Sequence, residues 1–237
     1  MRTCMRGSAV CFWFLCAVGA AGGAFVVEPA IITFDAAAGE RIAWAEVKNV
    51  GDGPIAVELT VFERVLDLDG ELDRKAQVPS LDFTVYPSEI IIQPGRKASV
   101  QFQYKRKERV TADKAYTLFS KEVLIPLDED EKEGVNVAVP TVLSYYTVVA
   151  FETGKEGRLT FVSSRALKDG MAELIVENRS GGRVAARNLA IKTDSDVIKN
   201  FTGVKNSIMP GQKRRFTFKY LRPLTSKEVK FIYDASD

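Results

Sequence analysis

The side chains that most often carry catalytic chemistry are scarce in this chain of 237 residues. It contains no histidine, and its cysteines are Cys4, Cys11 and Cys16. A serine or cysteine nucleophile therefore has no histidine base, and the common zinc sites built from histidine and cysteine are excluded. The sequence also has no P-loop, nucleophile elbow or dinucleotide-binding motif. We predict a protein that is not an enzyme and that has no catalytic residue, metal or cofactor.

One stretch of carboxylates could suggest a calcium site. Asp67, Asp69, Glu71 and Asp73 alternate there with leucine and glycine. This stretch lacks the run of ligands that an EF-hand loop requires. Acidic residues around a central glycine are instead typical of the tip of a hairpin. We therefore expect a solvated turn.

Residues 135–143 suggest another kind of chemistry, the pairing of backbone groups. Side chains alternate between the two faces of an extended strand. One face would consist of Val135, Val137, Val139, Thr141 and Leu143. Pro140 cannot donate a ladder hydrogen bond, which favours an edge position. An edge strand can pair with a further strand, although the same alternation is also typical of ordinary core packing in a sandwich.

The elements that must position these residues are β-strands. Alternation and β-branched residues dominate from Phe25 onward, and no long stretch has a helical period. We predict strands over residues 25–34, 41–48, 55–64, 81–86, 97–104, 116–125, 135–149, 158–164, 172–177, 185–192, 213–221 and 228–233. The acidic run 128–133 is typical of a solvated loop. Turn signals recur about every 8 to 12 residues, the spacing of an immunoglobulin-like sandwich.

A pair of turn signals occurs twice in the same order. Asn49 ends one apolar stretch and is followed later by Gln93-Pro94-Gly95, while Asn178 is followed by Met209-Pro210-Gly211. Proline presets φ and glycine accepts positive φ, so both copies predict hairpin corners. Two copies indicate an all-β chain with two tandem immunoglobulin-like β-sandwiches. We place these domains at residues 25–152 and 155–237.

Residues 1–24 have the features of a cleaved signal peptide. Arg2 and Arg6 precede an apolar run over residues 9–21, and small residues follow at 22–24. The run is shorter than the roughly 18–20 residues that a membrane-spanning helix needs. A lipoprotein is the alternative, since Cys11 and Cys16 lie nearby, but neither follows the usual small residues.

Cleavage near Phe25 would leave an exported chain without cysteine, which depends on hydrophobic burial alone. The formal net charge of +2 includes Arg2 and Arg6, so the remaining chain is close to neutral. A neutral exported protein is not expected to bind nucleic acid.

The order of these motifs resembles the periplasmic chaperones of the chaperone–usher pilus pathway, over nearly all of residues 25–237. The matching pieces in the first half are Phe25–Pro29, Val47-Lys48-Asn49 with Pro54–Leu59, Phe83–Pro87, Ile92–Gly95, Val100-Gln101-Phe102 and Tyr116–Pro126. Asn178 and Met209-Pro210-Gly211 resemble the smaller C-terminal domain. The resemblance implies two immunoglobulin-like domains set at an angle, like a boomerang, and a periplasmic location.

The resemblance also implies a function. A pilin subunit is similar to a sandwich without its last strand, and the chaperone lends a strand to the open groove. In position, residues 135–143 match that donor strand, and burial of its three valines would contribute about 5–6 kcal/mol before ordering costs. The implied partners are pilin or fimbrial subunits and an outer-membrane usher, with no stable membrane insertion.

The chain departs from this family at the cleft between the domains. Family members place one basic residue on the first strand and another on the last strand of domain one, where they bind the carboxylate of the pilin C-terminus. Residues 30–33 and 143–146 contain no lysine or arginine. Candidate replacements or cleft residues are Lys121, Arg158, Arg165, Tyr145 and Tyr146. The alternative is an exported two-domain structural or adhesive binding protein without chaperone activity.

Overall fold

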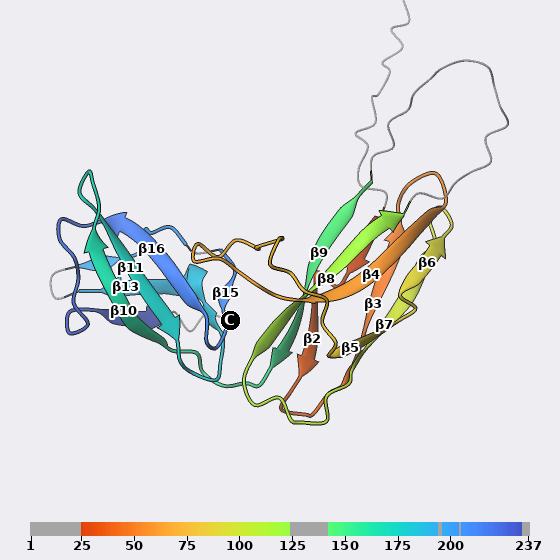
Figure 1. Ribbon diagram of the computed structural model, residues 1–237, viewed down its shortest axis with the longest axis horizontal. Helices are drawn as coiled ribbons and strands as arrows, with labels where there is room; N and C mark the ends of the chain where they lie inside the picture. The colour runs from red at the N-terminus through yellow and green to blue at the C-terminus, as the bar shows by residue number, and fades with distance from the viewer. Residues whose placement is uncertain (1–24, 124–141, 194–195, 204, 234–237) are drawn as a thin grey trace, which may run out of the picture.

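The computed structural model describes residues 25–123, 142–193, 196–203 and 205–233. Within these ranges the regular elements are β-strands, apart from one 3-10 turn, η1 (Ala186–Asn188). The predicted fold class is confirmed, because the chain forms two β-lobes set at an angle (Figure 1). In the described residues, no helical segment has the length and hydrophobicity needed to span a bilayer.

The first lobe is a sandwich of two sheets. Its strands are β1 (Phe25–Glu28), β2 (Ile31–Asp35), β3 (Ile42–Asn49), β4 (Ile55–Glu63), β5 (Phe83–Tyr86), β6 (Glu89–Ile92), β7 (Lys97–Tyr104), β8 (Lys114–Val123) and β9 (Ser144–Glu152). One sheet has the order β1-β3-β7-β5, and the other has the order β2-β9-β8-β4-β6. Neighbours in the second sheet are antiparallel, except that β2 runs parallel to β9.

The predicted strand 25–34 is two strands in the structure. Pro29, after a cis peptide bond, separates β1 from β2. Because proline has no backbone N–H, it interrupts the ladder. The break lets β1 pair with β3 in one sheet while β2 pairs with β9 in the other. The predicted strand 135–149 is observed from Ser144 onward, and residues 135–141 lie outside the described residues.

The core of the first sandwich follows from strand alternation. On β4, the buried side chains Ile55, Val57, Leu59 and Val61 occupy every second position. Aromatic rings from other strands complete this core, and Phe34 stacks on Phe151 with ring centroids 4.6 Å apart. Each fully buried side chain of this size contributes about 1.5–3 kcal/mol to stability. Packing of the two sheets therefore holds the first lobe together.

The second lobe has a core of its own. Its strands are β10 (Leu159–Ala166), β11 (Met171–Asn178), β12 (Val184–Ala185), β13 (Leu189–Lys192), β14 (Val197–Ile198), β15 (Ser207–Ile208), β16 (Lys213–Lys219) and β17 (Lys230–Tyr233). They form the sheets β10-β11-β16 and β14-β13-β17 and the pair β12-β15. Leu174, Ile191 and Phe216 lie fully buried between them. Among the described strands no pair joins the two lobes, and the domain bounds 25–152 and 155–237 stay a prediction.

The first of the two repeated corners is organised by a buried asparagine. The side-chain amide of Asn49 donates to the carbonyls of Gly53 at 2.8 Å and Ile92 at 2.9 Å. Its side-chain oxygen accepts a bond from the N–H of Gly51 at 2.9 Å. The side chain thereby ties the end of β3 to the end of β6, just before the Pro-Gly turn.

The second corner has the same design. The side-chain amide of Asn178 donates to the carbonyls of Gly182 and Ile208, both at 2.8 Å. Its oxygen accepts a bond from the N–H of Ser180 at 3.0 Å. In both lobes, then, an asparagine at a strand end holds the turn after it and the strand before a later Pro-Gly corner. The repeat seen in the sequence is a repeated hydrogen-bonding unit.

A buried aspartate joins the two lobes. Asp113, at the start of β8, accepts bonds from the N–H of Thr153 in the connecting segment at 2.8 Å and from the N–H of Arg183 in the second lobe at 2.9 Å. Its own N–H donates to the carbonyl of Gly181 at 2.8 Å. One residue of the first lobe therefore binds both the connection and the second lobe.

Candidate functional site

The candidate site begins at the edge of the five-stranded sheet. Strand β9 pairs with β8 from Ser144 onward, but its pairing with β2 begins only where Val148 lies opposite Ile31. Among the described residues, the stretch from Ser144 to Thr147 thus has a neighbouring strand on one side only. Such an edge presents unpaired N–H and C=O groups that a further strand can join.

The side chains of this edge alternate between the core and the outer face. Leu143 and Tyr145 pack against the core, and the ring of Tyr145 meets the ring of Phe25 edge-on at 4.9 Å. The carbonyl of Leu143 accepts a bond from the N–H of Glu122 at 2.9 Å. Of the predicted donor residues, Leu143 is described. Those outside the described residues are Val135, Val137, Val139 and Thr141, so the donor strand stays a prediction.

The outer face of the same sheet carries a row of aromatic side chains. Tyr146 of β9 packs on Phe119 of β8 at 5.0 Å between centroids, and Phe119 packs on Phe62 of β4 at 6.0 Å. The guanidinium of Arg74 lies 4.9 Å from the centre of the Tyr146 ring. The two tyrosines predicted for the cleft therefore have different roles, with Tyr145 turned to the core and Tyr146 to the outer face.

Arg64 lies directly after β4, at the end of this aromatic face. One Nη atom donates to Thr117 Oγ1 of β8 at 3.1 Å, and the other donates to Asn206 Oδ1 of the second lobe at 3.0 Å. The guanidinium is half-buried, and this burial lowers the pKa of Arg64. Within the described part of the chain, no carboxylate forms an ion pair with it.

An arginine in this state is chemically suited to bind an anion. Buried charges are usually paired, because loss of hydration is costly. The planar guanidinium matches a carboxylate, which it can bind through two parallel hydrogen bonds. Arg64 lies between the two lobes, bonded to both. Among the described residues it is therefore a cation at the junction that has no carboxylate partner.

The cations named from the sequence have other surroundings. Arg158 pairs with Glu156 at 3.1 Å, and Arg165 pairs with the buried Glu173 at 2.8 Å. Lys121 is exposed on β8, opposite Ser144 of β9. Sequence reasoning missed Arg64, although one signal was present: it follows Phe62 on the face opposite the alternating core residues of β4.

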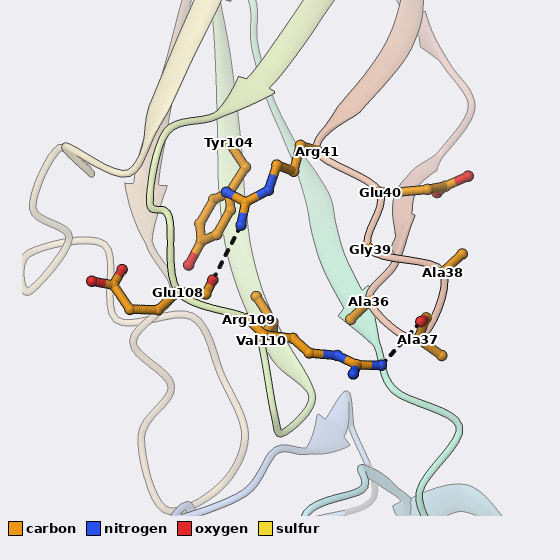
Figure 2. Close-up of a pocket in the computed structure, with 10 residues that line it drawn as sticks. All are labelled: Ala36, Ala37, Ala38, Gly39, Glu40, Arg41, Tyr104, Glu108, Arg109 and Val110. Atoms are coloured by element: carbon orange, nitrogen blue, oxygen red, sulfur yellow. Dashed lines mark hydrogen bonds between the residues drawn. The ribbon is translucent and has the colours of Figure 1, made fainter.

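A cavity of about 290 Å³ lies between residues 36–41 and 108–110, at the end of the first lobe where β2 and β9 end (Figure 2). Its cations are already engaged with the backbone. The Arg41 guanidinium donates to the carbonyl of Lys107 at 2.6 Å, and Arg109 donates to the carbonyl of Ala37 at 3.2 Å. These arginines hold the surrounding loops together. No group of acidic side chains suited to a metal ion occurs among the described residues.

Comparisons with known proteins identify the fold. No family model matches the sequence, and no curated protein matches it significantly. Solved structures do. A chain of the CsuC–CsuE chaperone–tip adhesion subunit pre-assembly complex from the archaic chaperone–usher Csu pili of Acinetobacter baumannii is 12% identical, with a TM-score of 0.54 over 82% of this chain and 90% of that chain.

Two further structures agree. The complex of the Salmonella enterica SafA pilin with the SafB chaperone gives 13% identity and a TM-score of 0.53, over 82% of this chain and 84% of that chain. The E. coli chaperone DraB gives 13% identity and a TM-score of 0.53, over 86% of both chains. The chain therefore has the two-domain immunoglobulin-like fold of the pilus chaperones, as its motifs indicated.

Proposed function

We propose that this protein is a periplasmic chaperone that binds pilus or fimbrial subunits by lending them a β-strand. The observation that carries the proposal is the edge of β9 at Ser144–Thr147, which among the described residues has a neighbouring strand on one side only. The half-buried Arg64 directly follows β4 of the same sheet. The donor strand would consist of residues 135–143 leading into β9. The same proposal includes export directed by residues 1–24, their cleavage, and a contact with an outer-membrane usher.

The start of β2 limits where a strand of a bound subunit, which we call the guest, can pair with β9. A guest that runs parallel to β9, as β2 does, would end its pairing where Ile31 takes over opposite Val148. Val148 is in turn opposite Thr117, the residue that holds Arg64. The carboxyl end of a parallel guest would therefore lie level with Thr117, whose hydroxyl accepts a bond from Arg64. Arg64 would then replace the basic anchors that residues 30–33 and 143–146 lack.

The aromatic row could contact an apolar side chain at the carboxyl end of such a guest. Phe62 and Phe119 are half-buried, and Tyr146 is 37% exposed. An apolar side chain near the guest carboxylate could cover these rings while the carboxylate meets Arg64. Apolar contact with a charge-assisted hydrogen bond would distinguish a chain end from an internal segment.

The donor strand is tested by paired substitutions on its two faces. The variant Val137→Asp with Val139→Asp places two charges on the face that would enter the subunit groove, so we expect loss of subunit capture on co-expression. The matched control, Asn136→Asp with Ala138→Asp, adds the same charge to the opposite face and should retain capture. Equal capture by both variants would contradict a donor strand in this register.

The anchor is tested by Arg64→Gln, which keeps hydrogen-bonding groups but removes the charge. A hydrogen bond to a charged group is worth about 1.5–3 kcal/mol, so the affinity for a subunit should fall about 10- to 100-fold. Arg158→Gln is the control, because Arg158 is exposed and paired with Glu156. Calorimetry with a purified subunit measures both. Equal affinities for Arg64→Gln and Arg158→Gln would exclude Arg64 as the anchor.

A structural or adhesive module without chaperone activity is the alternative function. It requires neither an open strand edge nor an unpaired cation at the lobe junction. The edge of β9 and the surroundings of Arg64 therefore favour the chaperone proposal over it.

A further inference from the structure

Residues 65–78, which we call the arm, leave the first lobe between β4 and β5 and reach the second lobe (Figure 1). The arm folds back on itself, with a β-bridge between Leu66 and Leu72. It begins one residue after Arg64. The arm could therefore affect both how the lobes are held together and where the Arg64 guanidinium lies.

The arm docks on the edge of β16. The carbonyl of Leu68 accepts a bond from the N–H of Arg215 at 2.7 Å, as between neighbouring strands. The carboxylate of Asp69 lies 3.4 Å from the Arg215 guanidinium, and Glu71 pairs with Lys205. Acidic side chains of the arm thus meet basic side chains of the second lobe. The sequence predicted a solvated turn here, whereas the structure uses its acids as contacts.

The fit is closest at Gly70. Its φ is +81°, and a Cβ added there would lie 2.1 Å from Arg214 Nη1 and 2.6 Å from the carbonyl oxygen of Lys205. Arg214 is fully buried at this place, and its Nη1 donates to the carbonyl of Gly203 at 3.0 Å. Only glycine combines this backbone conformation with this approach. The arm therefore covers a buried cation of the second lobe.

Asn206 connects the docked arm to Arg64. Its side-chain nitrogen donates to the carbonyl of Gly70 at 2.8 Å, while its side-chain oxygen accepts a bond from Arg64 Nη2 at 3.0 Å. Asn206 has a φ of +58°, a conformation that asparagine tolerates better than most residues. Docking of the arm and placement of the guanidinium thus depend on one side chain.

We propose that the arm is a latch that holds the two lobes together and that Asn206 is a positioning residue, which transmits arm docking to the Arg64 guanidinium. The consequence for carboxylate binding rests on the proposed function above. The latch itself does not, because every contact that defines it lies within this chain.

Cross-linking tests the latch without a client. A chain that starts at Phe25 has no cysteine, so Asp69→Cys with Arg215→Cys introduces one unique pair. A short bismaleimide should join the two cysteines within single molecules. Adding Gly70→Val should reduce the cross-linked fraction at least tenfold, because the valine side chain collides with Arg214. An unchanged fraction after Gly70→Val would overturn the latch.

Trypsin gives a second readout on the cysteine-free protein. Arg74 and Lys75 are exposed cleavage sites within the arm. Gly70→Val should accelerate cleavage there at least tenfold. Gly53→Val is the matched control and should leave the rate unchanged, since a Cβ at Gly53 meets no atom within 4 Å. Equal rates for the two valine variants would count against docking of the arm.

Asn206→Gly tests the positioning role, because glycine keeps the left-handed backbone and removes both side-chain bonds. The probe is a nonapeptide of alternating threonine and valine ending in phenylalanine, with a free or an amidated C-terminus. We expect the wild type to prefer the free carboxylate about tenfold, and Asn206→Gly to lose this preference while its affinity for the amide is unchanged.

The possible results separate the two proposals. A preference that persists in full in Asn206→Gly overturns the positioning role. Absence of any preference in the wild type overturns both the Arg64 anchor and its positioning by Asn206. In that case the cross-linking and trypsin results still decide whether the arm is a latch.

Discussion

Asp82 is a buried carboxylate, 3% exposed, that three side chains stabilise in the first lobe. The hydroxyl of Tyr116 donates to it at 2.7 Å, Arg106 forms an ion pair with it, and Lys114 lies 4.0 Å away. Burial alone would raise the pKa of Asp82, but the bonds from Tyr116 and Arg106 outweigh burial and hold that pKa below its usual value. Burial and the bond to Asp82 raise the pKa of Tyr116. This group ties the segment before β5 to β8.

The lowered pKa of Asp82 predicts a pH-dependent stability. Its contribution is fully present above the unfolded-state pKa of about 3.9 and is lost as the pH falls through the lower folded-state pKa. At pH 7 we expect Asp82→Asn to lose about 1–3 kcal/mol of unfolding free energy. The difference from the wild type should shrink as the pH falls below about 4. Urea titrations across this pH range measure it.

The exposed Asp52 provides the control, because Asp52→Asn should leave the unfolding free energy at pH 7 unchanged. A difference between wild type and Asp82→Asn that stays constant down to the lowest pH would contradict ionisation as its cause.

Among single residues, the sequence indicates those whose hydrogen-bond partners lie only a few residues away along the chain. Asn49 and Asn178 were recognisable because their turn partners lie within four residues. Arg64 was not, since its partners are 53 and 142 residues away along the chain. The same separation hid Asn206. A lone cation after an apolar strand indicates a place to examine, but only the fold brings its partners together.

Among the elements, the strands predicted best are those with strict alternation. The range 97–104 coincides with β7, and the range 55–64 exceeds β4 by one residue. The strand β14 was not predicted, because two residues carry too little alternation. For β6 and β15 the Pro-Gly corners indicated a preceding strand but not its bounds. Pro140 indicated an edge position near the start of β9, but the length of the edge seen in the described residues depends on where β2 begins, which the sequence did not predict.

The two asparagine corners should contribute similarly to stability. Asn49→Ala and Asn178→Ala each remove the side-chain donor to a buried strand carbonyl, that of Ile92 or that of Ile208. Each should therefore lower the unfolding free energy by about 1–3 kcal/mol. Thermal unfolding followed by circular dichroism measures the effect. Asn200→Ala is the control, because Asn200 is exposed. If either corner variant were as stable as this control, the shared design would not be a stabilising unit.

The whole molecule consists of two separately packed lobes joined by polar contacts. Each lobe has its own hydrophobic core. The junction instead depends on polar contacts: those of the arm, those of Asp113, and an ion pair between Arg183 and Glu152 at 2.9 Å. Interfaces of this polar kind usually permit relative motion of domains. The angle between the lobes is thus controlled by a few hydrogen bonds.

Asp113→Ala should loosen this junction while both sandwiches stay folded. The variant loses the carboxylate that binds Thr153 and Arg183. We expect small-angle X-ray scattering to show a larger radius of gyration, and calorimetry to show two separate unfolding transitions. Asp52→Ala should match the wild type in both measurements. A single unchanged transition together with an unchanged radius in Asp113→Ala would show that the junction does not depend on this carboxylate.

The arm also has a consequence for the order of events during biosynthesis. Asp69 precedes Arg215, with which it pairs, by 146 residues. A polypeptide that emerges amino end first presents the arm long before the strand that receives it has been made. The first sandwich can therefore fold while the arm still has no strand to contact. Closure of the molecule waits until β16 with Arg215 has emerged.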